Sequence, residues 1–211
     1  VLSLCEITGK PVLVLQGRFH FYEGYPMAEV VFPTRVLAAL GIRSLIVTNA
    51  AGSLREALPP GRIVMLTDHI NFMGTNPLIG HNDEALGERF PSMNEQFDPL
   101  YRNTCRKLAS ELDIELSEGV YIGVSGPSLE TKAECSFFAQ IGADLVGMST
   151  VPEVIAARHA GLKVLGFSIV TNYSNLFHNL AHSQEEIREH AGKAGKDLRR
   201  LLESFISTEV F

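Results

Sequence analysis

The sequence predicts an α/β protein with a mostly parallel central sheet flanked by helices. Short runs of apolar and β-branched residues recur along the chain, and segments with helical periodicity separate them. The runs lack an apolar–polar alternation, which is typical of strands buried on both faces. The 211 residues are 45% hydrophobic, enough for a core, and no repeat or linker divides them. We therefore expect one domain over residues 1–211.

The first half of the chain is predicted to hold strands on both sides of one broken helix. Strands are expected at 11–17, 44–52 and 61–68, and a glycine turn joins the first of them to an earlier strand. Helical spacing covers 26–40, but Pro33 should bend or split this helix because proline has no amide hydrogen for the helix interior. Residues 70–97 hold few periodic apolar positions and are predicted to be a long loop, a kind of segment that is usually functional.

The second half alternates between strand and helix. Strands are expected at 118–126, 143–149 and 162–172, and helices at 98–112, 128–142 and 151–160. The first of these helices has Asp98 as its cap and Pro99 at its first position. A capping box from Ser183 to Glu186 opens a long final helix. The apolar stripe of that helix comprises Ile187, Ala191, Ala194, Leu198, Leu201 and Phe205.

Composition and spacing narrow the class of function. The net charge is −6, whereas general nucleic-acid binders are usually basic. No stretch approaches the roughly 20 apolar residues needed to cross a bilayer. The three cysteines are isolated, which indicates a reduced, cytoplasmic protein without disulfides. His178 and His182 are four residues apart, but no cysteine or carboxylate set accompanies them, so a zinc site is disfavoured. We expect no metal, no nucleic acid and no membrane partner.

The residues beyond the carboxyl ends of the strands are candidates for a site, because ligands of open α/β sheets bind there. Four predicted strand ends carry polar or small residues: 17–24, 48–54, 126–131 and 147–153. Each of them has an ordinary structural explanation when it is taken alone. Their joint placement predicts an anion-binding pocket.

The segments 17–24 and 48–54 supply groups that suit an anion. On a strand, Arg18, His20 and Tyr22 point to one side, and the arginine presents a planar fork of donors that suits phosphate or carboxylate. The alternative is an exposed strand edge whose polar side faces water. The small residues of 48–54 let backbone N–H groups approach an anion closely, although they also suit a tight turn.

The other two strand ends lie at predicted helix starts. Glu130 falls in the first turn of a helix that Ser128 could cap, where an acidic residue ordinarily complements the helix dipole. The hydroxyls of Ser149 and Thr150 could cap the following helix or bind an anion at its N-terminus. Structural and ligand-binding roles both stay open for these residues.

Six segments, spread over nearly the whole chain, match a known enzyme family in order. They are QGRFHFYEGYP, VTNAAGSL, DHINF, NDEALGERFP, GVSGPSLET and GADLVGMSTVPEVIAARHAGLKVLGFSIVTN, and the final helix follows them. These segments resemble the purine nucleoside phosphorylases of the trimeric type.

The resemblance implies a fold, a reaction and an assembly. The fold would be a mixed α/β fold around a distorted barrel. The reaction would be cleavage of inosine, guanosine and their deoxy forms by inorganic phosphate, giving the free base and (deoxy)ribose 1-phosphate. The resemblance implies a homotrimer with phosphate as co-substrate and no other cofactor. It also implies that the family's N-terminal portion, with its Gly-Ser-Gly-Leu-Gly phosphate loop, is missing here, and a chain truly this short is expected to be weakly active or inactive.

By matching motif, the resemblance assigns the site residues. The phosphate site would comprise Arg18, His20, the backbone N–H of Ala50 and the Ser149 hydroxyl. The ribose site would comprise Tyr22, Met148, His182 (with His178 as its rival) and Phe90, which would reach into a neighbouring subunit. The base site would comprise Leu129, Glu130, Val146 and Asn172. The residues expected to carry catalysis are His20, Glu130, Asn172 and His182.

Asn172 is expected to set the base preference. Its amide can both donate and accept, which suits a 6-oxopurine that receives a proton at N7, whereas the related methylthioadenosine phosphorylases carry Asp there. Glu130 would accept a hydrogen bond from N1–H. Three alternatives stay open: a preference for xanthosine, a preference for methylthioadenosine, and a nucleoside-binding protein with impaired catalysis.

Overall fold

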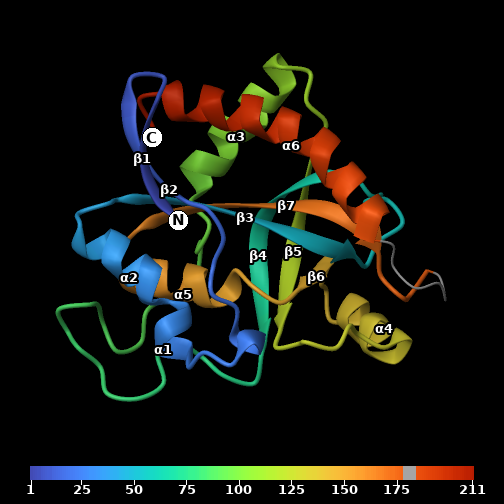
Figure 1. Cartoon of the computed structure of the whole chain (residues 1–211), viewed down its shortest axis with the longest axis horizontal. Helices are drawn as coiled ribbons and strands as arrows, with labels where there is room; N and C mark the ends of the chain where they lie inside the picture. The colour runs from blue at the N-terminus through green and yellow to red at the C-terminus, as the bar shows by residue number, and fades with distance from the viewer. Residues whose placement is uncertain (178–183) are drawn as a thin grey trace.

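A closed barrel of strands forms the centre of the computed structural model (Figure 1), which describes residues 1–177 and 184–211 without the side chains of 184–191 and 193. The strands are β3 (Ser44–Ser53), β4 (Ile63–Phe72), β5 (Leu116–Val124), β6 (Leu145–Gly147) and β7 (Lys163–Tyr173), in the order β3-β6-β5-β4-β7. The pairs β3–β7, β4–β5 and β5–β6 are parallel, whereas β3–β6 and β4–β7 are antiparallel. The predicted α/β fold with a mixed, mostly parallel sheet is confirmed.

An antiparallel hairpin lies outside the barrel. It consists of β1 (Leu2–Ile7) and β2 (Lys10–Leu15), with Gly9 in the turn at a φ of +81°. Such a positive φ is a conformation that glycine adopts without steric cost. Figure 1 shows the hairpin beside the C-terminal helix, with which β1 is in contact. The predicted strand, turn and strand at the start of the chain are confirmed.

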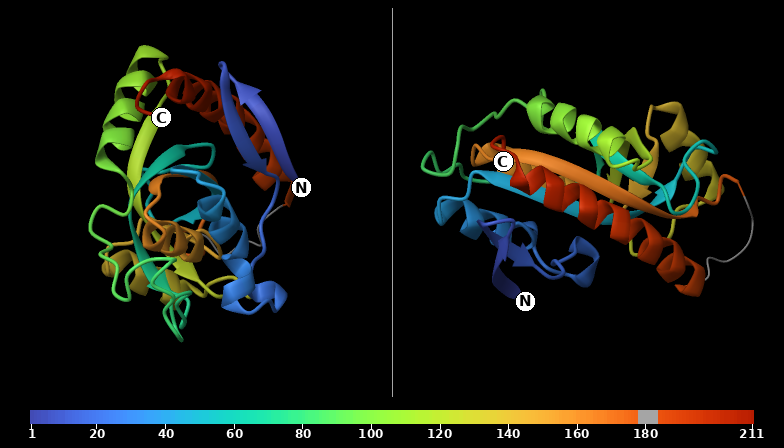
Figure 2. Two further views of the ribbon diagram at one scale, coloured as in Figure 1. Left: turned by 90° about the vertical axis from the view of Figure 1, so that its left-hand side faces the viewer. Right: turned by 90° about the horizontal axis from the view of Figure 1, so that it is seen from above.

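Helices cover the barrel from two sides (Figure 1). On one side, α3 (Pro99–Glu111) and α6 (Gln184–Ser207) pack on β4 and β7, and Figure 2 shows α6 lying along β7. On the other side lie α1 (Met27–Val30), α2 (Phe32–Ala39) and α5 (Val151–His159). The remaining helix, α4 (Lys132–Gln140), packs on β5 and β6 through contacts among Ile122, Phe138 and Val146. Burial of both barrel faces explains the continuous apolar runs of the strands.

Three helix boundaries follow the sequence signals. The helix predicted over 26–40 is split at Val31, and Pro33 lies in the first turn of α2, where its missing N–H has no partner to lose. Asp98 caps α3 by accepting the Tyr101 backbone N–H at 3.0 Å. In α6 the stripe residues Ala194, Leu198, Leu201 and Phe205 are buried, as predicted. Ser183 of the predicted capping box and the side chains of Ile187 and Ala191 lie outside the described part of the chain.

The prediction that 17–24 forms a strand is wrong. The strand β2 ends at Leu15, Gly17 follows at a φ of +89°, and Phe21–Glu23 form a short 3-10 turn, η1. The Glu23 carboxylate accepts the His20 backbone N–H at 2.9 Å, so a side chain takes the place of a neighbouring strand as the partner of this amide.

Two further boundaries differ from the prediction. Helix α4 begins at Lys132 and is capped by Thr131 in a capping box with Glu134, so Ser128 is not its cap and Glu130 precedes the helix. The strand β4 extends to Phe72 and shortens the predicted 70–97 loop. By contrast, the strand predicted at 44–52 is confirmed as β3, which includes the small residues 48–53 and a bulge between Ala51 and Gly52.

No helix in the described ranges is both long enough and apolar enough to cross a membrane.

Candidate active site

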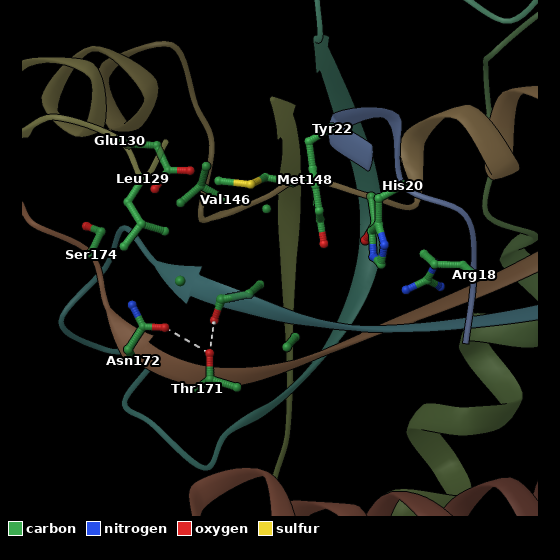
Figure 3. A pocket seen from close by; sticks show the side chains of 15 residues that line it. Arg18, His20, Tyr22, Leu129, Glu130, Val146, Met148, Thr171, Asn172 and Ser174 are labelled. Carbon is green, nitrogen blue, oxygen red and sulfur yellow. Dashed lines mark hydrogen bonds between the residues drawn. The ribbon is translucent and has the colours of Figure 1, made fainter. Parts of the chain in front are cut away.

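A cavity of about 400 Å³ lies where several strands of the barrel end. Five segments that are distant in sequence line it (Figure 3). Its lining contains ten of the residues singled out above: Arg18, His20, Tyr22, Ala50, Leu129, Glu130, Val146, Met148, Ser149 and Asn172. It also contains Ala51, Gly52, Gly147, Thr171 and Ser174.

The cavity has two chemically different ends (Figure 3). Arg18 and His20 lie at one end, whereas Glu130 and Asn172 lie at the other. Met148 lies between them. The cavity therefore offers a guanidinium and an imidazole at one end and a carboxylate with an amide at the other.

Arg18 is held by two protein acceptors. Its Nε donates to Glu153 Oε2 at 2.9 Å, and its Nη2 donates to the Thr48 carbonyl at 2.9 Å. The side chains of Arg18 and Glu153 are only 21% and 16% exposed, so this pair is largely shielded from water. Because a guanidinium carries five N–H donors, the remaining donors are free to serve a ligand in the cavity.

His20 lies against Tyr22 and Glu23. The rings of His20 and Tyr22 stack with their centroids 4.7 Å apart, and His20 Nδ1 lies 3.5 Å from Glu23 Oε1. The backbone hydrogen bond from His20 lowers the pKa of Glu23. The lowered pKa favours the ionised form of Glu23, whose carboxylate fixes the backbone of His20 from outside the cavity.

Ser149 lies in the sharp turn between β6 and α5. Thr150 occupies the N-cap position of α5 but makes no side-chain cap, so the predicted capping role is wrong for this residue. The Ser149 hydroxyl instead lies 3.1 Å from Thr150 Oγ1, and the Ser149 backbone N–H donates to the Tyr121 hydroxyl at 3.3 Å. Tyr121 is fully buried, and burial raises the pKa of its phenol.

Gly147 permits this close packing under the cavity. A Cβ at this position would lie 2.3 Å from the Tyr121 hydroxyl oxygen, closer than any side chain tolerates. The strand β6 can therefore approach Tyr121 only because residue 147 is glycine.

At the other end, burial raises the pKa of Glu130. Asn175 Nδ2 donates to the Glu130 carbonyl at 2.7 Å and so fixes the segment that carries this side chain. The Asn172 amide is held on both sides: Thr171 Oγ1 donates to its Oδ1 at 2.8 Å, and its Nδ2 donates to the Tyr173 carbonyl at 3.0 Å.

One predicted site residue does not join the cavity in the single chain. Phe90 is 85% exposed and lines a separate hollow with His69, Ile79 and Met93. His182, like its rival His178, lies outside the described residues. In the ranges 1–177 and 184–211, no group of three or more His, Cys, Asp or Glu side chains is placed to hold a metal ion.

Comparison with known proteins identifies the family. The sequence model of the Phosphorylase superfamily matches residues 2–207. Purine nucleoside phosphorylase 1 of Bacillus subtilis is 46% identical over 206 residues, which are 98% of this chain and 76% of the relative. This chain belongs to the purine nucleoside phosphorylases. The mammalian members are similarly close: the phosphorylase of Rattus norvegicus is 46% identical over 95% of this chain and 71% of its own.

Solved purine nucleoside phosphorylases have the same fold. The enzyme of Schistosoma mansoni in complex with inosine superposes with a TM-score of 0.94 at 39% identity, covering 98% of this chain and 76% of the other. A complex of that enzyme with adenosine gives a TM-score of 0.94 at 39% identity, covering 99% and 77%. The predicted phosphorylase fold is confirmed, and so is membership of a family of pentosyltransferase enzymes.

Sequence reasoning did not single out every residue that shapes this phosphorylase site. Thr171 and Ser174 lie on either side of Asn172 at the end of β7. Polar side chains at the end of a buried strand are visible in the sequence, so these two residues could have been predicted as part of the lining. Glu153 lies in a matched motif, but its pairing with Arg18 spans 135 residues of sequence, so no local pattern indicated it.

Proposed function

We propose that this protein cleaves 6-oxopurine nucleosides, namely inosine, guanosine and their deoxy forms, with inorganic phosphate. The observation that carries the proposal is a single cavity, lined also by Ser149, that has Arg18 and His20 at one end and Glu130 and Asn172 at the other. Residues 1–211 would act as one domain, with phosphate as the co-substrate and no other cofactor.

The phosphate would bind at the Arg18 end. Arg18, His20, Ser149 and Ala50 all line this cavity, and the phosphate would take hydrogen bonds from the guanidinium, the imidazole, the Ser149 hydroxyl and the Ala50 backbone N–H. A dianion there stabilises the positive charge that develops on the ribose as the bond to the base lengthens. Tyr22 and Met148, between the two ends, would contact the sugar.

The purine would bind at the Glu130 end. Asn172 would donate to N7 as negative charge develops on the leaving base, and ionised Glu130 would accept from N1–H. A phosphate oxygen forms the new bond to C1′ while the N-glycosidic electrons leave with the purine, which takes up a proton. The products are the free base and (deoxy)ribose 1-phosphate. Leu129 and Val146 would provide apolar contacts to the ring.

The proposal includes a homotrimer. The Phe90 side chain is 85% exposed on a long loop, and an exposed aromatic side chain of this kind suits a subunit contact. We propose that Phe90 closes the ribose site of a neighbouring subunit.

The deciding experiment measures release of hypoxanthine from inosine with and without phosphate. We expect release only with phosphate, together with formation of ribose 1-phosphate. Guanosine and 2′-deoxyinosine should react at comparable rates, and adenosine and xanthosine much more slowly. Binding of hypoxanthine without any release from inosine would contradict the proposal and indicate a binding protein. Faster turnover of xanthosine or methylthioadenosine would overturn the base preference alone.

A further inference from the structure

A chain of buried polar side chains leads from the strand β7 to Ser149. Ser168 Oγ donates to Asn49 Oδ1 at 2.7 Å, and Asn49 Nδ2 donates to Thr150 Oγ1 at 2.9 Å. Thr150 Oγ1 then lies 3.1 Å from Ser149 Oγ. Ser168, Asn49 and Thr150 are 0%, 9% and 1% exposed, so water does not compete for these hydrogen bonds.

The chemistry of the Asn49 amide sets the direction of its hydrogen bond with Thr150. An amide NH₂ can only donate, so Asn49 occupies an acceptor position on the Thr150 oxygen. The single Thr150 proton is then available for its neighbour, Ser149 Oγ. In the arrangement in which Ser149 Oγ accepts this proton, the proton of Ser149 itself is left to point into the cavity that Ser149 lines. Hydrogen bonds in such a series polarise and strengthen one another.

The backbone of Thr150 gives independent evidence that its position is imposed. Its φ of 67° and ψ of −51°, with a Val151 N–H to Ser149 carbonyl hydrogen bond of 2.7 Å, describe a γ-turn of the rare, strained type. A β-branched residue is disfavoured at such a φ. A strained backbone conformation of this kind persists only where several surrounding contacts hold it in place, and such conformations are frequent at ligand sites. The Asn49 hydrogen bond is one such contact.

We infer that Thr150, backed by Asn49 and Ser168, is a positioning residue that presents the Ser149 hydroxyl as a donor to phosphate. The inference rests on the proposed function, because it takes Ser149 as a phosphate ligand. Thr150 touches no substrate in this arrangement and acts only through its neighbour. The Ser149 main chain is held separately, by Tyr121.

The test compares KM for phosphate and KM for inosine in Thr150→Val and Thr150→Ser. Valine keeps the shape but loses the hydroxyl, so we expect KM for phosphate to rise roughly 3- to 10-fold, as for loss of one neutral hydrogen bond, with KM for inosine changed less than about twofold. Thr150→Ser keeps the hydroxyl and should stay near the wild-type value. Thr67→Val, which removes a hydroxyl that bonds the Gly119 carbonyl at 3.2 Å outside the cavity lining, is the matched control and should leave KM for phosphate unchanged.

A double-mutant cycle separates positioning from general damage. In the Ser149→Ala background, Thr150→Val should add less than about a twofold further change, because the group it positions is gone. The same increase in both backgrounds, or an equal loss in Thr150→Ser and Thr150→Val, would overturn the inference. An unchanged KM for phosphate in Thr150→Val would also overturn it and would indicate that Tyr121 alone orients Ser149.

Failure of the inference and failure of the proposed function are distinguishable. If Ser149→Ala leaves KM for phosphate unchanged, the proposed phosphate site fails and the inference with it. If Ser149→Ala raises KM but Thr150→Val does not, only the inference fails. Should Thr150→Val not fold, Ser168→Ala at the far end of the chain serves the same test, with an expected increase of roughly twofold and no change as the contradicting result.

Discussion

The Asn172 amide is constrained by its neighbours in a way that favours one class of purine. Thr171 donates to Oδ1, and one Nδ2 hydrogen goes to the Tyr173 carbonyl. This arrangement leaves the second Nδ2 hydrogen for a ligand. A donor at this position suits N7 of a 6-oxopurine in the transition state better than it suits a 6-amino group.

We predict that Asn172→Asp shifts the preference of the enzyme from inosine toward adenosine. A carboxylate accepts from the 6-amino group but, when ionised, has no donor for N7. Loss of one buried hydrogen bond costs about 1–3 kcal/mol, so kcat/KM for inosine should fall by roughly 5- to 150-fold. The measurement is the ratio of inosine to adenosine turnover, and an unchanged ratio would refute this role.

Glu130 is expected to impose an acidic limit on substrate binding. Burial raises its folded-state pKa, so it takes up a proton at a higher pH than an exposed glutamate does as the pH falls. The protonated form cannot accept from N1–H through the protonated oxygen. KM for inosine should therefore rise as the pH falls, beginning at a pH where an ordinary glutamate with a pKa of about 4.3 remains ionised.

The control for this prediction is Glu130→Gln, which has no ionisable group. Its KM for inosine should be high throughout and nearly independent of pH. A variant that keeps the wild-type pH profile would show that another group causes the limit.

At the residue scale, most residues that line the cavity were predictable from the sequence, whereas the residues that hold them in position were not. Arg18, Ser149 and Asn172 belong to matched motifs, and chemistry-bearing residues at strand ends are visible without a structure. Glu153, Asn49 and Ser168 bond across 101–135 residues of sequence, and one chain carries no signal for such pairings. Phe90 and His182 keep their status as predictions.

At the scale of elements, the N-terminus of α5 connects the arginine to the turn that carries Ser149. Glu153 lies in the first turn of this helix and holds Arg18 through a shielded hydrogen bond. The helix thus positions Ser149 through its preceding turn and Arg18 through a side chain, so one rigid element aligns two proposed phosphate ligands.

We predict that Glu153→Ala raises KM for phosphate by about tenfold, because a charge-assisted hydrogen bond is worth roughly 1.5 kcal/mol or more. KM for inosine should change less than about twofold. Glu153→Gln retains an acceptor for Arg18 Nε and should recover much of the loss. Steady-state kinetics with varied phosphate test this, and an unaltered KM for phosphate in Glu153→Ala would contradict it.

The types of most elements were predictable from the sequence, whereas two predictions, for residues 17–24 and for the start of α4, were wrong for local reasons. Apolar runs identified the barrel strands, and Pro33 identified the split between α1 and α2. At 17–24 the alternation suggested a strand, but a glycine turn and the Glu23 carboxylate satisfy the backbone instead. At α4, Ser128 was the expected cap, but Thr131 takes this place because it has a glutamate, Glu134, at the spacing that a capping box requires.

At the scale of the whole molecule, the exposed Phe90 leads to a prediction about mixed assemblies. If Phe90 completes the site of a neighbouring subunit, Phe90→Ala should lower kcat/KM for inosine by about tenfold or more, as for truncation of an aromatic anchor. Co-assembly of Phe90→Ala with Asn172→Ala subunits should restore activity above that of either parent. In a mixed trimer, the cavity of a Phe90→Ala subunit, which retains Asn172, can be completed by Phe90 of an Asn172→Ala neighbour.

The control is each variant refolded alone and mixed only afterwards, without exchange of subunits. Activity in co-assembled trimers that does not exceed the sum of the parents would refute the shared site.

Closure of the barrel also determines the stage of folding at which the cavity can form. The pair β3–β7 joins residues about 120 positions apart, from Ser44 with Lys163 to Ser53 with Tyr173, so it brings Ala50 onto the strand next to the one that carries Asn172. Contacts between such distant segments form late because a long loop must first be closed. During refolding, recovery of turnover should therefore lag behind recovery of helical circular dichroism, since neither half of the chain can assemble a partial catalyst.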